Sequence, residues 1–164
     1  MDKLLNRRVH TYARRKKLRL AEPLGHGVHG TIYASRRKSQ PGSVAVKAHR
    51  SQDGYERERD VYLRLKNEGI DEILGFNVPR FISSDDQLLV LEMTIVARPF
   101  VLDFAGAYLD HLPHFSDEIW AEWETQKRDQ FEHRWPMVQK ILNALEELDI
   151  HMIDVSPSNV AFAS

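Results

Sequence analysis

The sequence contains no cysteine. The absence of thiols excludes disulfide bonds and thiolate metal sites, and it is compatible with a reducing compartment. Long apolar runs are also missing, so the chain has neither the core of a signal peptide nor a candidate membrane span. We therefore expect a cytoplasmic protein that has no membrane partner.

An excess of charge of either sign is absent as well, because the formal net charge of the 164 residues is −1. This balance argues against nucleic acid as a partner. Basic side chains gather in residues 1–17, a basic arm that we expect to be a solvated lead-in to the first strand. Docking of the arm on phosphate or on an acidic partner is the alternative.

Short strand-like runs dominate the first part of the chain. Glycine, proline or acidic turn residues separate them. The runs cover residues 17–24, 31–34, 44–47, 79–83 and 87–93. Between the third and fourth runs, Val61, Tyr62 and Leu65 recur at helical intervals within residues 55–67. The pattern predicts an α+β fold with a five-stranded antiparallel sheet and one helix, over residues 18–94.

Helical patterns dominate residues 95–164. Ser116 can cap a helix whose apolar side includes Trp120 and Trp123, and Pro136 can open a second helix with one continuous apolar stripe. No linker separates these helices from the sheet, so we expect one domain over residues 1–164. Its second half is a shortened helical region joined to the sheet through residues 92–94.

Gly25, Gly27 and Gly30 have the spacing G-x-G-x-x-G, which lets main-chain amides approach phosphate closely. The plain alternative is a flexible hairpin. A dinucleotide-binding turn, with Asp53 as a ribose ligand, requires a helix directly after the glycines. A strand pattern comes next instead, which favours a phosphate-binding hairpin.

Lys47 ends the third strand-like run. A lysine inside a cleft needs a carboxylate partner as well as phosphate. Glu58 in the next helix is our candidate partner, and Glu56 is the reserve because it lies nearly two-thirds of a turn away. A glutamate on the surface of an amphipathic helix is the plain alternative.

The order of these motifs resembles the protein-kinase-like superfamily from about residue 18 to residue 160. The last motif is D-x-x-P-x-N, formed by Asp154, Pro157 and Asn159 directly after a predicted long helix. The chain is similar to a truncated or minimal member of this superfamily and resembles bacterial serine/threonine kinases. The resemblance implies a cleft between two lobes that binds ATP and Mg²⁺.

The resemblance also implies roles for single residues. Asp154 would accept or orient the proton of a substrate hydroxyl, Asn159 would bind Mg²⁺, and Lys47 would pair with phosphate and with Glu58. The three glycines would lie over the phosphates. The residues implied around the adenine are Ile32, Ala45, Leu91 as gatekeeper, Glu92 and Thr94.

Two features depart from the family pattern. Met152 and Ile153 replace the histidine and arginine of H-R-D, which argues against control by a phosphorylated activation loop. The sequence ends at Ser164, before a D-F-G motif could follow. Residues 103–106, D-F-A-G, resemble that motif superficially, but they precede the late loop and contain an extra residue. We interpret them as ordinary structure.

The sequence leaves two functions open. One is an ATP-dependent phosphotransferase acting on a protein or small-molecule hydroxyl, and the other is a pseudokinase-type binding module without catalysis. We expect nucleotide binding in both. The short helical half is compatible with a partner chain or dimer that completes it, and with a fragment of a longer kinase. Asp110, His111 and His114 are too few and too irregularly spaced to predict a zinc site.

Overall fold

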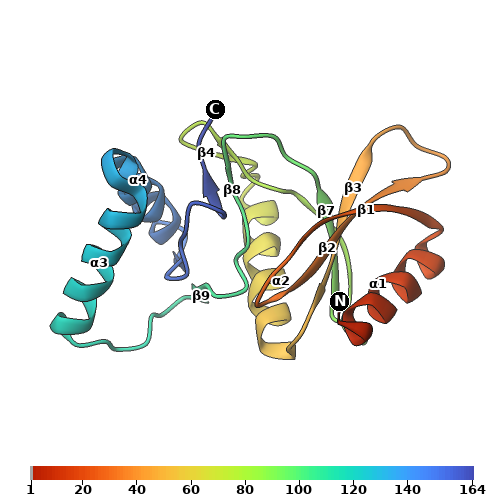
Figure 1. Ribbon diagram of the computed structural model, residues 1–164, viewed down its shortest axis with the longest axis horizontal. Helices are drawn as coiled ribbons and strands as arrows, with labels where there is room; N and C mark the ends of the chain where they lie inside the picture. The colour runs from red at the N-terminus through yellow and green to blue at the C-terminus, as the bar shows by residue number, and fades with distance from the viewer. Residues whose placement is uncertain (1) are drawn as a thin grey trace.

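A five-stranded antiparallel sheet forms the first half of the molecule (Figure 1). The computed structural model describes residues 2–164. The strands of this sheet are β1 Leu18–His26, β2 Gly30–Arg37, β3 Ser43–His49, β6 Phe81–Asp85 and β7 Val90–Thr94. Their order is β1-β2-β3-β7-β6. The predicted α+β class and the five-stranded antiparallel sheet are confirmed.

β3 is the central strand of the sheet, and its residues from Ala45 to His49 are buried. Side chains alternate between the two faces of a strand, and both faces of β3 are covered. Ala45 and Lys47 face one layer, while Val46 and Ala48 face the other. This alternation, together with the β-branched residues in the run, explains why the third strand was predicted correctly.

Helix α2, Gln52–Asn67, covers the face of the sheet that carries Lys47. Ser51 caps the helix, because its hydroxyl oxygen accepts a hydrogen bond from the amide of Gly54 at 3.2 Å. Val61 and Leu65 are buried on the inner side. Glu58 lies on the same side, three and seven residues before them, so the helical period itself directs its carboxylate inward.

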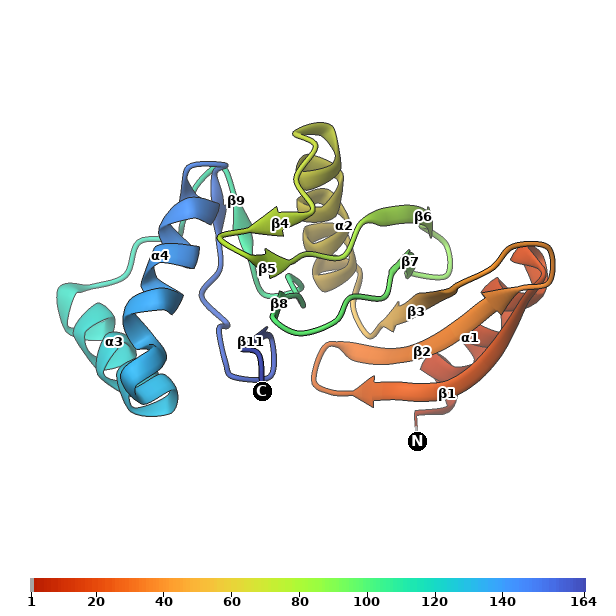
Figure 2. The same cartoon turned by 90° about the horizontal axis from the view of Figure 1, so that it is seen from above.

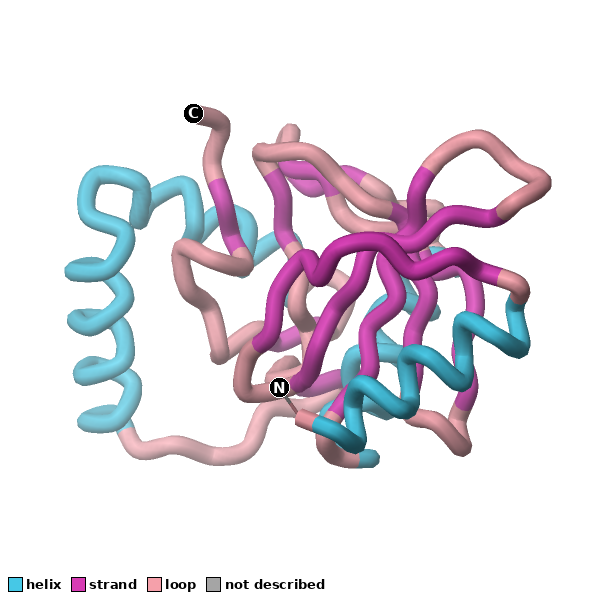
Figure 3. The backbone as a smooth tube through the Cα atoms, turned by 45° about the vertical axis from the view of Figure 1, so that its right-hand side comes forward, coloured by secondary structure: helices cyan, strands magenta, loops and turns pink. Residues whose placement is uncertain are grey.

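Helix α1, Lys3–Lys16, covers the opposite face of the sheet and runs across the strands (Figure 3). The prediction of a solvated lead-in is therefore wrong, and the sheet carries two helices instead of one. Leu5, Val9 and Tyr12 recur at helical spacing and are buried against the sheet. Their stripe is hidden among basic residues in the sequence, and those basic side chains occupy the outer side of the helix.

A buried carboxylate fixes the position of α1. Both oxygens of Glu92 are bonded: one accepts a hydrogen bond from the hydroxyl of Tyr12 at 2.8 Å, and the other contacts Arg37 at 2.6 Å. Because a buried charge is tolerated only when it is paired, this cluster ties α1 to β2 and β7.

The second half of the molecule consists of short strands and two longer helices, at the end away from the large sheet (Figure 2). A four-stranded sheet has the order β11-β8-β5-β4, and β10 pairs with β9. The elements are β4 Glu72–Ile73, β5 Phe76–Asn77, β8 Phe100–Val101, β9 Tyr108–Leu109, α3 Asp117–Phe131, η1 Glu132–Arg134, α4 Trp135–Glu146, β10 Ile150–His151 and β11 Val160–Ala161.

The predicted helix starts are confirmed. Ser116 caps α3 by accepting a hydrogen bond from the amide of Ile119, and Pro136 lies in the first turn of α4. The apolar stripe of α4 joins the same core that lies between α2 and the large sheet, so one core spans both halves. None of the helices within residues 2–164 combines the length and apolar character that a bilayer crossing requires.

The burial of α1 predicts a difference between two neighbouring leucines. Leu5→Ala should lower the free energy of unfolding by about 2–5 kcal/mol, because Leu5 is 1% exposed and its removal leaves a cavity. Leu4→Ala is the matched control, since Leu4 is 54% exposed and its loss should cost about 0.5 kcal/mol or less. Urea unfolding of both variants measures the difference. Equal, small effects would show that α1 does not dock on the sheet.

Candidate functional site

A cavity of about 520 Å³ lies under the turn between β1 and β2, where the large sheet meets the second half of the chain. One wall is apolar and includes Ile32, Ala45 and Met93. The cavity also contains the charged side chains of Lys47 and Glu58. Cavities of this size with an apolar wall and a few fixed polar groups are typical of small-molecule sites.

Lys47 lies between two carboxylates. Its Nζ is 2.7 Å from Oε2 of Glu58 and 2.7 Å from Oδ1 of Asp103. The residue is 8% exposed, and Glu58 is 1% exposed. The structure therefore brings together the predicted Lys47–Glu58 pair, and it places Glu56 on the outer side of α2, bonded to Gln52.

His49 supports the same pair from β3. Its Nε2 lies 2.5 Å from Oε2 of Glu58, and the whole ring is buried. Burial opposes ionisation of Glu58, but the charge of Lys47 and then the contact with His49 outweigh it and lower the pKa of Glu58 to about 2. Burial likewise opposes the charge of Lys47, and the two carboxylates outweigh it and raise the pKa of Lys47.

Asp103 is the site residue that the sequence interpretation missed. We interpreted residues 103–106 as ordinary structure, because they precede the late loop. In the structure, Asp103 lines the cavity and contacts Lys47. Its φ of 68° lies in the left-handed region, which aspartate tolerates better than most residues and which is enriched at functional sites. The available signal was the acid that opens D-F-A-G directly after the short apolar run of residues 100–102.

Strand pairing explains how Asp103 reaches the late loop. β8 and β11 are antiparallel, with Val101 opposite Val160, and the amide of Leu102 donates a hydrogen bond to the carbonyl of Asn159 at 2.9 Å. Asp103 comes directly after Leu102, and Asn159 also lines the cavity. The interpretation of residues 103–106 as ordinary structure overlooked this pairing, because order along the chain does not fix which strands become neighbours.

The late loop places Asp154 opposite the glycine-rich turn. Oδ2 of Asp154 lies 3.0 Å from Nε2 of His29, and the aspartate side chain is 61% exposed. The side-chain amide of Asn159 donates to the carbonyl of Asp154 at 2.7 Å, while its oxygen accepts from the amide of Ser156 at 2.7 Å. Asp154 and Asn159 are thus held in one rigid loop next to the cavity.

The three predicted glycines all line the cavity, but the space available for a side chain differs between Gly30 and Gly27. A Cβ at Gly30 would lie 2.1 Å from the carbonyl oxygen of Ala48, so glycine is required there by strand packing. A Cβ at Gly27 would meet nothing within 4 Å, and its amide closes the turn by donating to the carbonyl of Gly30. Because β2 begins directly after the turn, the requirement for a dinucleotide-binding helix is not met.

The remaining predicted residues fall in different places. Thr94 lines the cavity, but its amide and hydroxyl are bonded to Arg80. Glu92 points to the opposite face, toward α1, and its main chain lies between β3 and β6. Leu91 packs in the core and does not line the cavity, whereas Met93, two residues later on the same strand, does. Ile95 and Val96, directly after Thr94, also line the cavity, and the sequence interpretation missed them.

Two glycine substitutions should distinguish a glycine that strand packing requires from a glycine that lies in open space. Gly30→Ala should lower the free energy of unfolding by about 1–3 kcal/mol or more, because the added methyl group collides with main chain. Gly27→Ala should leave stability within about 0.5 kcal/mol, because the space is open. Thermal and urea unfolding measure both. A stable Gly30→Ala variant would contradict the close approach of β2 to β3.

The lowered pKa of Glu58 predicts an acid-sensitive contribution to stability. This contribution should be complete above pH 4.5, the ordinary value for the group, and should be lost as the pH falls toward about 2. Glu58→Gln should therefore destabilise the protein at pH 7 and flatten its loss of stability in acid. Glu56→Gln is the control and should follow the wild type. Urea unfolding at several pH values measures the free energy of unfolding of each protein. If this free energy changed with pH in the same way for Glu58→Gln and for the wild type, the prediction would be refuted.

Comparisons of the chain with protein-family models, with curated proteins and with solved structures found no match. The function is therefore inferred from the geometry of the cavity and from the residues around it.

Proposed function

We propose that the cavity binds a nucleoside triphosphate, with ATP as the expected ligand, and that the protein transfers its terminal phosphoryl group to a hydroxyl. The observation that carries this proposal is the position of Lys47. It is a buried cation held by two carboxylates in a cavity that also has an apolar wall and a glycine turn. The proposal corresponds to the cleft of a protein-kinase-like fold.

Each part of a nucleotide has a suitable partner in the cavity. The base fits against Ile32, Ala45 and Met93, which are apolar, with the main chain of residues 95–96 at the rim. The phosphates fit beside Lys47 and under Gly27, where no β-carbon limits their approach. Because Lys47 is already oriented by Glu58, little rearrangement is needed before it meets phosphate.

The donor set is suitable for Mg²⁺ when phosphate is present. Asp103 supplies a carboxylate and Asn159 an amide oxygen that retains a free lone pair, and both line the cavity. Mg²⁺ usually binds to one or two carboxylates together with substrate phosphates. Within residues 2–164 no three acidic, histidine or cysteine side chains are grouped as a metal site, so phosphate oxygens would have to complete the coordination. The ion would neutralise charge on the phosphates.

In the proposed phosphoryl transfer, Asp154 acts as the general base. Its carboxylate accepts the proton of the acceptor hydroxyl while the oxygen–phosphorus bond forms, and the bond to the leaving diphosphate breaks. The exposure of Asp154 leaves it accessible to an acceptor. Lys47 stabilises the charge that builds up on the phosphates as the diphosphate leaves.

A binding module without catalysis is the second candidate. The contact between Asp154 and His29 favours it, because the carboxylate proposed as the base is already bonded to the glycine turn. In this function the turn and the late loop would close over the nucleotide, and the protein would signal the bound state to a partner. Turnover separates the two candidates.

ATP with Mg²⁺ should raise the melting temperature of the wild type. At a ligand concentration 100 times Kd the gain is about 2.7 kcal/mol, which corresponds to roughly 5–10 °C for a domain of this size. Asp103→Asn should reduce the part of the shift that depends on Mg²⁺, because it removes one proposed ligand and leaves the Lys47–Glu58 pair in place. Lys47→Met should abolish the shift, and Lys38→Met on the exposed turn after β2 is its control. Absence of a shift in the wild type would refute nucleotide binding.

Asp154→Asn should retain the nucleotide-dependent thermal shift and lose phosphoryl transfer by at least about 100-fold. The measurement is release of ADP with candidate hydroxyl acceptors, including the protein itself. Ser158→Ala, in the same loop, is the control and should retain most of the rate. Binding without turnover in the wild type would select the second candidate, and unchanged turnover in Asp154→Asn would refute the role of the base.

A further inference from the structure

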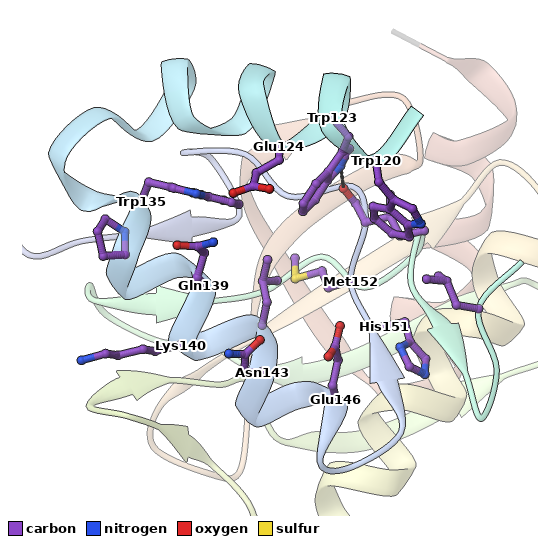
Figure 4. Close-up of a pocket in the computed structure, with 14 residues that line it drawn as sticks. Trp120, Trp123, Glu124, Trp135, Gln139, Lys140, Asn143, Glu146, His151 and Met152 are labelled. Carbon is purple, nitrogen blue, oxygen red and sulfur yellow. Dashed lines mark hydrogen bonds between the residues drawn. The ribbon is translucent and has the colours of Figure 1, made fainter. Parts of the chain in front are cut away.

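A second cavity, of about 540 Å³, lies between α3 and α4 (Figure 4). It shares no lining residue with the cavity around Lys47. The three tryptophans of the chain, Trp120, Trp123 and Trp135, all line it. Trp135 belongs to the hydrophobic core and Trp123 packs against it, while all three indoles also border this cavity.

The indole rings form adjacent walls. Trp120 and Trp123 have ring centroids 5.6 Å apart and planes inclined by 86°, and Trp123 and Trp135 are 5.9 Å apart with planes inclined by 69°. The ring of Trp123 is fixed, because its Nε1 donates a hydrogen bond to the carbonyl of Ile153 at 3.1 Å. Roughly perpendicular indoles around one space present ring faces from more than one side, as cation-binding aromatic cages do.

The charged groups around the cavity favour a cation. Figure 4 shows the carboxylates of Glu124 and Glu146 directed into the space between the helices, whereas the ammonium of Lys140 extends away from the indoles. Glu124 is bonded to Arg128 at 3.0 Å, so part of its charge is neutralised. Glu146 has no ion-pair partner among the residues that the structure describes.

The end of α4 adds to the negative potential. Glu146 is the last residue of this helix, and the last turn contains no basic residue. The carboxyl end of a helix dipole is negative and favours a cation. An acid at this position is unfavourable for the helix alone, so a positively charged ligand would relieve the repulsion. His151, from β10, completes the charged and titratable groups that line the cavity.

We propose that this second cavity binds an organic ammonium ion, with its apolar substituents against the three indoles and with Glu146 as the counter-charge. An alkylated ammonium fits better than a metal ion, because three indole rings and Met152 line the cavity, and within residues 2–164 no three acidic, histidine or cysteine side chains are grouped as a metal site. Ile153 lines the cavity and directly precedes Asp154, so the ligand would lie beside the late loop. An effect of the bound cation on Asp154 would matter only if the proposed function is correct. Binding of the cation to the second cavity does not depend on that function.

The test uses choline as a probe quaternary ammonium ion and 3,3-dimethylbutan-1-ol as its neutral isostere. Because every tryptophan lines this cavity, intrinsic fluorescence reports on it selectively. Titrations at constant ionic strength, in a buffer without organic cations, should show saturable binding of choline. The neutral isostere should bind about tenfold more weakly, since it lacks the attraction to the ring faces and to Glu146.

Two glutamates at the end of α4 supply a matched pair of variants. Glu146→Gln should weaken choline binding several-fold, whereas Glu147→Gln should leave it unchanged, because Glu147 is exposed and lies outside the cavity lining. Both positions are exposed, so neither change should unfold the protein. Trp120→Leu should also weaken binding.

The outcomes that would overturn the proposal are distinct. Absence of saturable choline binding would show that the cavity is a packing gap, and equal affinity for the neutral isostere would show an apolar pocket without cation selectivity. Equal affinities of Glu146→Gln and Glu147→Gln would place the ligand elsewhere. Titrations of Asp103→Asn, which keeps the Lys47–Glu58 pair, separate this proposal from the first one, since a reduced nucleotide response should leave the choline response unchanged.

Discussion

The contact of Lys47 with Glu58 and Asp103 is the interaction on which the rest of the structure depends. It joins two consecutive elements, β3 and α2, to the loop after β8, which is distant from both in sequence. Glu58 is almost completely buried, and a buried carboxylate without a cation would be strongly destabilising. The ion pairs therefore fix the position of α2 against the sheet and hold the loop after β8 under the glycine turn.

The same constraint arranges the chemistry around the cavity. With the loop after β8 held in place, pairing of β8 with β11 brings the late loop beside it, so that Asn159 and Asp103 line one space. The contact of His29 with Asp154 then closes the opposite side. The second cavity shares no lining residue with the first, although His151, Met152 and Ile153, just before Asp154, line it together with residues of α3 and α4. The two ligands that we propose, a nucleotide and an organic ammonium ion, would therefore occupy separate cavities.

Much of the fold was predictable, because it depends on local patterns. Alternation of side chains located the strands, Ser116 and Pro136 located two helix starts, and the helical period distinguished Glu58 from Glu56. Helix α1 was missed because eight basic side chains in its neighbourhood obscured the stripe of Leu5, Val9 and Tyr12. Charge on one side of a helix carries no information about burial of the other side.

The sequence by itself determined the strand meander, the glycine turn and the pairing of Lys47 with a glutamate of the next helix. These features depend on residues close in the chain and on simple periodicity. Only the tertiary structure decided that Asp103 joins the site, that Met93 rather than Leu91 faces the cavity, and that three tryptophans enclose a second one. Those outcomes depend on strand register and on contacts between distant segments, because the packing of the whole chain selects which surfaces meet.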